Sequence, residues 1–214
     1  MNEKTTYTAI IGDLIGSRQI ENRRGLQRKL LDSLSDINRE FTTSLHAGFI
    51  ITTGDEFQAL AKDLETAYEL TIELKHRLYP HGVRFGIGKG ALDVFPENRE
   101  YAIGFDGEAF WRAREAIEES EKRGVSAIFR TGTEIDDILK SIQIGIDWIV
   151  GKRTEKQARA TILYQSGLDQ KEISERMDTI QPGVSRFLKE GGCFAELSLK
   201  KGIIGVISGC RNIT

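Results

Sequence analysis

Two acidic positions far apart in the sequence carry side chains suited to holding a cation. Asp55 and Glu56 follow Gly54 within residues 49–60, where an apolar run, a glycine-containing break and a second apolar run predict a β-hairpin with acids at its tip. Asp13 ends an earlier apolar, β-prone run. Hairpin tips also carry polar residues for solvation, so the hairpin alone is equally compatible with an ordinary surface turn.

The elements that would position these acids follow the order strand, helix, strand, strand, helix, strand. Apolar alternation or helical spacing predicts a strand at 6–11, a helix at 23–41, the hairpin at 49–60, a helix at 63–79 capped by Asp63, and a strand at 83–92. This order is typical of the ferredoxin-like βαββαβ fold, in which the first and third strands are antiparallel neighbours. The fold therefore brings Asp13 and Asp55 to one edge of the sheet.

Two carboxylates at one edge repel each other unless one is protonated or a cation lies between them. Mg²⁺ (or Mn²⁺) suits such a pair, because it binds one or two carboxylates and completes its shell with water and phosphate oxygens. The loop after Asp13 contains Gly16 and Ser17, whose backbone N–H groups could face phosphates. The residues thus predict a metal site that could also hold a nucleotide.

Three motifs in order resemble the class III nucleotidyl cyclases over residues 6–132. They are Ala-Ile-Ile-Gly-Asp13-Leu-Ile-Gly-Ser, Thr-Gly-Asp55-Glu-Phe and Phe85-Gly-Ile-Gly-Lys-Gly, and the second is also similar to the hairpin of the diguanylate cyclases. The resemblance implies an α+β, palm-like domain with metal ligands at Asp13, Asp55 and the adjoining Glu56. It also implies nucleotide contacts, at Leu14, Gly16, Ser17, Arg18, Gly54 and Arg114.

The sequence departs from the cyclase pattern at the groups that complete the chemistry. Arg114 matches the helical arginine of the adenylyl type, but Phe110 occupies the position of its asparagine partner. Ile51 replaces the base-reading lysine, and Thr53 replaces the second hairpin glycine of the diguanylate type. We therefore expect nucleotide and metal binding rather than cyclisation of a standard substrate.

The C-terminal part predicts a second kind of site. Helices are expected at 157–164, 170–177 and 181–188, with a turn at 178–180, and the last two resemble the helix-turn-helix of bacterial repressors and sigma-type factors. The resemblance implies contacts with double-stranded DNA, to bases or phosphates, by Gln170, Lys171, Gln181, Ser185, Arg186 and Lys189. A helical hairpin used only for packing or dimerisation is the alternative.

The totals of the sequence support a globular protein with a divided charge. The net charge of −2 is the sum of −6 over residues 1–150 (19 basic, 25 acidic) and +4 over 151–214 (11 basic, 7 acidic). The basic part could face a polyanion. The sequence has no apolar run long enough for a membrane span, no apolar core of a signal peptide, and two cysteines without metal-ligand spacing. We therefore expect a cytoplasmic location, with no membrane partner and no structural zinc.

The order of the parts, a cyclase-like body before a helix-turn-helix, resembles the bacterial SatD family. The predicted organisation is a palm domain at 1–132, a linker helix at 133–154 and a helix-turn-helix domain with a C-terminal tail at 155–214. Three functions stay open. The chain could be a homodimeric, DNA-binding transcriptional regulator controlled by a nucleotide with Mg²⁺, a metal-dependent enzyme acting on a nucleoside triphosphate, or a DNA-binding protein whose palm domain only dimerises.

Overall fold

The computed structural model describes residues 5–211, apart from the side chains of Arg18, Cys210 and Arg211. The chain is a mixed α+β protein that divides into two compact units, Met1–Lys140 and Ser141–Thr214. The first contains a five-stranded sheet and the second is helical. Within the described residues, no helix is both long and apolar enough to cross a membrane.

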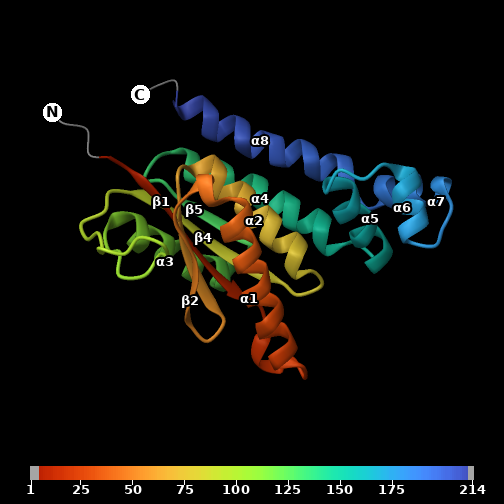
Figure 1. Cartoon of the computed structure of the whole chain (residues 1–214). Coiled ribbons are helices and arrows are strands. Elements are labelled where there is room, and N and C mark those ends of the chain that lie inside the picture. Colours follow the sequence, from red (N-terminus) through yellow and green to blue (C-terminus); the bar gives the residue numbers. More distant parts are fainter. Residues whose placement is uncertain (1–4, 212–214) are drawn as a thin grey trace. The chain divides into compact units, whose positions relative to one another are not determined.

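The sheet of the N-terminal unit has the strand order β2-β3-β1-β4-β5 (Figure 1). Its strands are β1 (Tyr7–Leu14), β2 (Leu45–Thr53), β3 (Glu56–Ala61), β4 (Val83–Gly90) and β5 (Ala127–Arg130). Its helices are α1 (Arg23–Glu40), α2 (Leu64–Leu78) and α3 (Glu108–Arg123). The predicted antiparallel pairing of the first and third strands is confirmed, since Gly12 of β1 lies opposite Phe57 of β3. A parallel fifth strand, β5, extends the sheet beyond β4.

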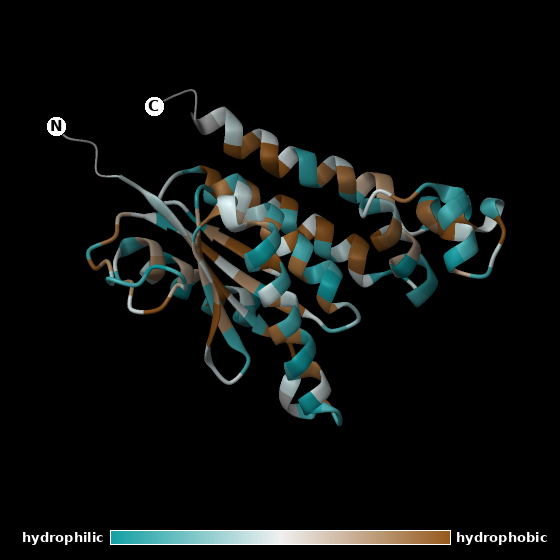
Figure 2. Cartoon of the chain, in the orientation of Figure 1, coloured by the Kyte–Doolittle hydropathy of each residue, from teal (hydrophilic) through white to brown (hydrophobic). Residues whose placement is uncertain are grey.

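The helices form where spacing and caps predict them. In α1, Leu26, Leu30, Leu34 and Ile37 are buried, because residues three or four apart share one helix face. The Asp63 side chain accepts a hydrogen bond from the N–H of Thr66, so the predicted cap of α2 is confirmed. Figure 2 shows that hydrophobic residues, coloured brown, also lie along the strands in the middle of the sheet.

Glycines on one face of β4 bring α3 unusually close to the sheet. A Cβ atom added at Gly86 would lie within 3.0 Å of backbone atoms of Ala113 and Ile117 in α3. A Cβ at Gly88 would meet the backbone of Ala109 and Ala113 in the same way. On this face, α3 therefore packs against backbone rather than side chains.

The helix α4 (Ile135–Gly151) runs across the division between the units, at residues predicted to form a linker helix. The C-terminal unit continues with α5 (Glu155–Gln165), α6 (Gln170–Arg176), α7 (Gln181–Glu190) and α8 (Cys193–Arg211). Its core is a cluster of buried side chains, Ala160, Ile173, Val184, Leu188 and Cys193.

The spacing of apolar residues over 170–188 predicts a small core of Ile173, Met177, Ile180, Val184 and Leu188, and for one of these residues the prediction is wrong. Ile180 is 70% exposed, whereas Ile173, Val184 and Leu188 are buried as predicted. Ile180 is the N-cap of α7 and has an extended backbone, so the helical spacing used to place it inside does not apply there. Apolar residues in the C-terminal tail predict a helix that Gly202, Gly205 and Gly209 disfavour, and this tail forms the continuous helix α8.

Candidate functional site

The fold brings the first two candidate acids together. Asp13 lies at the end of β1, beside the start of β3, and Asp55 lies in the turn that precedes β3. The pKa of Asp13 is raised from 3.8 to about 6, first by burial and then by the negative charge of Asp55 and a hydrogen bond shared with it. Two residues 42 positions apart in the sequence are therefore brought to the same edge of the sheet.

A cation already lies beside this pair. Arg84 of β4 is directly across from Asp13 in the antiparallel register, and its Nε is 3.2 Å from Asp13 Oδ2. Its guanidinium also contacts Glu121 of α3 at 3.1 Å. The charge of Arg84 lowers the pKa of Asp13, but by less than burial and Asp55 raise it. Arg84 is not among the predicted site residues, although the alternation in 83–90 and the predicted neighbouring strands could have identified it.

The hairpin tip is a tight turn in which Gly54 has a positive φ of 65°, a conformation that favours glycine. The next acid, Glu56, has a different partner from Asp55. Its carboxylate forms a two-point ion pair with Arg114 of α3, with 2.8 Å between Oε1 and one guanidinium nitrogen. Hydrogen bonds from Arg114 lower the pKa of Glu56. Thr52 Oγ1 donates a further hydrogen bond to the same carboxylate at 3.1 Å.

The loop after Asp13 turns sharply, with Gly16 exposed and Ser17 only 6% exposed. Gly16 is left-handed, with φ 69°, and leads into a short 3-10 turn, Ser17–Gln19. The N–H groups of Gly16 and Ser17 donate to no other group in the described part of the chain, whereas Gln19 donates back to the Gly16 carbonyl. Leu14 is buried, and the side chain of Arg18 lies outside the described residues.

A second arginine of α3 has a structural role. Arg112 pairs with Glu108 at 2.8 Å and donates hydrogen bonds to the carbonyls of Lys89 and Thr131 at 2.5 and 3.2 Å. Both carbonyls lie at the ends of neighbouring strands, so Arg112 ties α3 to the sheet. Phe110, at the position of the cyclase asparagine, is 7% exposed and belongs to the core.

The donor set fits Mg²⁺ in part. No group of three or more His, Cys, Asp or Glu side chains is arranged to hold a metal among residues 5–211. Two neighbouring carboxylates could nevertheless hold Mg²⁺ when phosphate and water supply the remaining oxygens. Asp13 and Asp55 would hold the ion, whereas Glu56 is neutralised by Arg114.

The candidate DNA-contacting residues lie on α6 and α7. Gln181, Ser185, Arg186 and Lys189 are exposed on α7, away from the buried Val184 and Leu188. The turn between the helices includes Asp178 with φ 48°, the left-handed conformation that aspartate tolerates. At the start of α6, Lys171 is exposed, but its N–H and that of Glu172 bond to the Asp169 side chain at 2.8 and 2.9 Å. These N–H groups are therefore not free for a phosphate.

The solved structures that this chain is similar to include two nucleotidyl cyclases. One is the guanylyl cyclase domain, described as dimeric and non-canonical, of the RhoGC fusion protein from the aquatic fungus Blastocladiella emersonii. The match covers 54% of this chain and 74% of that chain, at 13% identity and a TM-score of 0.41. A bacterial light-regulated adenylyl cyclase is 10% identical with a TM-score of 0.42, over 58% and 74%. These similarities are too low to assign an activity.

A regulator of polyketide synthase expression from Bifidobacterium adolescentis matches over 94% of this chain and 85% of its own, at 11% identity and a TM-score of 0.27. Comparison with curated proteins gave no match. The SatD family profile matches residues 7–203, which is nearly the whole described chain. The chain therefore belongs to the SatD family.

Proposed function

We propose that the chain is a DNA-binding regulator whose N-terminal unit binds a nucleotide together with Mg²⁺. The observation that carries the nucleotide part is the meeting of Asp13 and Asp55, with the pKa of Asp13 raised to about 6. A partly buried carboxylate that is hard to ionise gains most from a bound divalent cation, since the cation replaces the missing solvation and offsets the repulsion. Phosphate oxygens would complete the coordination of that ion.

The loop at Gly16 and Ser17 supports the same proposal. Its two free N–H groups follow Asp13 within four residues, and backbone N–H groups in such loops bind anions. The nucleotide would therefore have its phosphates at the loop and the ion at the two aspartates. Arg114 would contact the nucleotide only by leaving Glu56, because both guanidinium nitrogens that face the hairpin are engaged.

Calorimetric titration with ATP and with GTP, each with and without Mg²⁺, tests this part. Binding of at least one triphosphate should require Mg²⁺ and should be lost in Asp13→Asn and Asp55→Asn. Asp32→Asn, which removes an exposed acid from α1, is the matched control and should bind like the wild type. Absence of heat with both nucleotides, or binding that persists in both site variants, would refute it.

The DNA-binding part rests on the exposed face of α7. Ser185 follows Gln181 by about one helical turn and Arg186 is the next residue, so the three lie on neighbouring parts of the exposed surface of α7, which could enter a major groove. Arginine and glutamine bond guanine and adenine in bidentate fashion. We expect Arg186→Ala to weaken binding of the preferred duplex by about 1–3 kcal/mol. Equal affinity of the wild type and Arg186→Ala for selected sequences would exclude this face.

A second candidate is an enzyme acting on a nucleoside triphosphate. It is favoured by Arg114, which α3 brings from 58 residues away to the hairpin that bears Asp55. Incubation with the four triphosphates and Mg²⁺ or Mn²⁺ distinguishes the two. Turnover that disappears in Asp55→Ala would favour the enzyme, whereas Mg²⁺-dependent binding without turnover would favour the regulator.

A further inference from the structure

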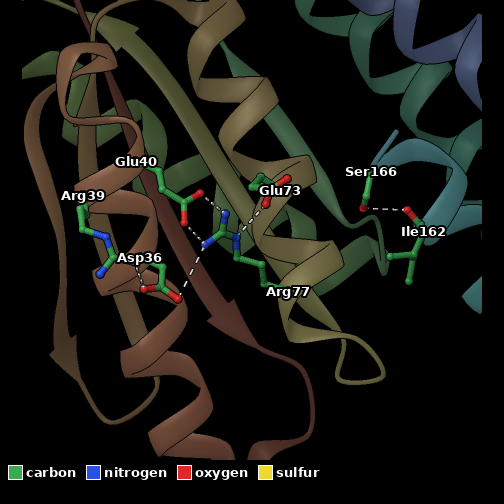
Figure 3. Close-up of polar contacts among 7 residues, drawn as sticks. All are labelled: Asp36, Arg39, Glu40, Glu73, Arg77, Ile162 and Ser166. Atoms are coloured by element: carbon green, nitrogen blue, oxygen red, sulfur yellow. Dashed lines mark hydrogen bonds and ion pairs between the residues drawn. The ribbon is translucent and has the colours of Figure 1, made fainter. Parts of the chain in front are cut away.

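The N-terminal half of α1 carries arginines without acidic partners. Arg23, Arg24 and Arg28 are exposed, and none forms an ion pair with a described residue. Most other arginines of this unit do form ion pairs within 4.0 Å: Arg39, Arg77, Arg84, Arg112, Arg114, Arg123 and Arg130. Figure 3 shows the contrast farther along the same helix, where Arg39 meets Asp36 and Arg77 meets Glu40.

These arginines are also at the unfavourable end of the helix. The N-terminus of a helix carries a partial positive charge that favours acids and disfavours cations. The first turn of α1 contains no acid, and Asn22 is its neutral cap. The sequence therefore keeps a local electrostatic conflict, of the kind that natural proteins retain mainly where function requires it.

The local charge opposes that of the unit around it. Residues 22–31 contain four cations (Arg23, Arg24, Arg28 and Lys29) and no acid. Residues 1–140 as a whole contain 19 basic and 24 acidic residues, a net charge of −5. Lys29 is committed to the fold, because its ammonium donates a hydrogen bond to the Tyr79 carbonyl at 2.6 Å. The three arginines form the exposed part of this positive patch.

The patch has the spacing and the chemistry for a repeating anion. Arg24 and Arg28 are four residues apart, so they lie on one face about 6 Å apart along the helix axis. Duplex DNA repeats its phosphates about every 3.4 Å along each strand, so two such side chains can reach different phosphates. Guanidinium groups bind phosphate in bidentate fashion, and arginine is the residue most used for this.

We propose that Arg23, Arg24 and Arg28 form a second nucleic-acid contact, which binds duplex phosphates without reading bases. This inference rests on the proposed DNA-binding function, and it adds a partner surface to the N-terminal unit. Each phosphate neutralised contributes about 0.9 to the slope of log affinity against log salt. Three contacts correspond to a slope of about 2.7, or roughly a 40-fold greater loss of affinity between 50 and 200 mM salt.

The test measures binding of a labelled 20-base-pair duplex by fluorescence anisotropy at 50, 100 and 200 mM salt. It compares the full-length wild type with Arg23→Gln/Arg24→Gln/Arg28→Gln and with Lys62→Gln/Lys122→Gln/Arg123→Gln. The second triple variant is the matched control, since it removes the same charge from exposed residues elsewhere in the unit. The α1 variant should fold with a melting temperature no lower than that of the wild type, because it removes cations from a helix N-terminus.

A salt slope lower by about 2.7 in the α1 variant but not in the control supports the inference. Equal salt slopes in the two triple variants would overturn the inference. The proposed DNA-binding function would still stand if Arg186→Ala binds the duplex more weakly than the wild type does. If the wild type binds no duplex at 50 mM salt, both the inference and the proposed DNA-binding function fail. If the α1 variant loses affinity only for a triphosphate, the patch belongs to the nucleotide site and the inference is wrong.

Discussion

Replacing Asp13 with asparagine should stabilise the metal-free protein at neutral pH. Burial and Asp55 raise the pKa of Asp13 from 3.8 to about 6, so the folded state retains a proton that the unfolded state releases. Between these two pKa values the folded state binds more protons than the unfolded state. The free energy of unfolding therefore falls as the pH rises. The shift corresponds to at most about 3 kcal/mol, and about 2 kcal/mol of it lies between pH 4.5 and pH 7.5.

The measurement compares the two proteins at both pH values. Urea unfolding is measured in EDTA by tryptophan fluorescence. In a Trp148→Phe background the signal comes from Trp111, so it reports unfolding of the N-terminal unit. Trp148 is 68% exposed, so its replacement should perturb little. The free energy of unfolding of Asp13→Asn, relative to that of the parent, should increase by about 2 kcal/mol between pH 4.5 and pH 7.5.

Asp137→Asn is the control for this pH dependence. Lys140 lowers the pKa of Asp137, so the contribution of this aspartate changes only below about pH 4. Its difference from the parent should therefore stay nearly constant from pH 4.5 to pH 7.5. If the difference for Asp13→Asn is equally constant, or decreases with pH, the electrostatic description of the paired aspartates is wrong.

Three further substitutions test other parts of the structure. Gly88→Ala should prevent stable folding of the sheet unit, measured by circular dichroism, because the new Cβ would meet the α3 backbone. Leu188→Ala should cost about 2–5 kcal/mol in urea unfolding of the C-terminal unit, since Leu188 is fully buried. Glu196→Ala should lower the melting temperature and cost about 3–5 kcal/mol, because it leaves the buried cations of Arg153 and Lys200 uncompensated. Unchanged stability in any of the three would contradict the packing described for that residue.

The meeting of Asp13 and Asp55 could be predicted from the sequence because it depends only on strand order. Alternation and helical spacing identified the strands and helices, and the ferredoxin-like order then fixed which strand ends are neighbours. The side chains that modify this pair were harder to predict. Arg84 contacts Asp13 because the register of β1 and β4 places the two residues opposite each other. A shift of one residue would turn the Arg84 side chain to the other face of the sheet.

The partner of Arg114 could not be chosen from the sequence. Glu115, Glu118 and Glu119 are the acids nearest to Arg114 on its own helix, yet Arg114 pairs with Glu56, 58 residues away. Local spacing gives several equivalent acids on a helix, whereas the tertiary fold selects one. For the same reason, spacing correctly predicted the buried Val184 but placed Ile180 in the core, where the helix has not yet begun.

The face of β4 that carries Gly86 and Gly88 limits how α3 can respond to a ligand. Because Gly86 and Gly88 hold the helix against the sheet backbone, α3 cannot slide by a turn without driving a side chain into a strand. A ligand that separates Arg114 from Glu56 must therefore be accommodated by rotation of these two side chains. Any signal that leaves this site would travel as a change in charge and side-chain conformation, while the helix and sheet remain in register.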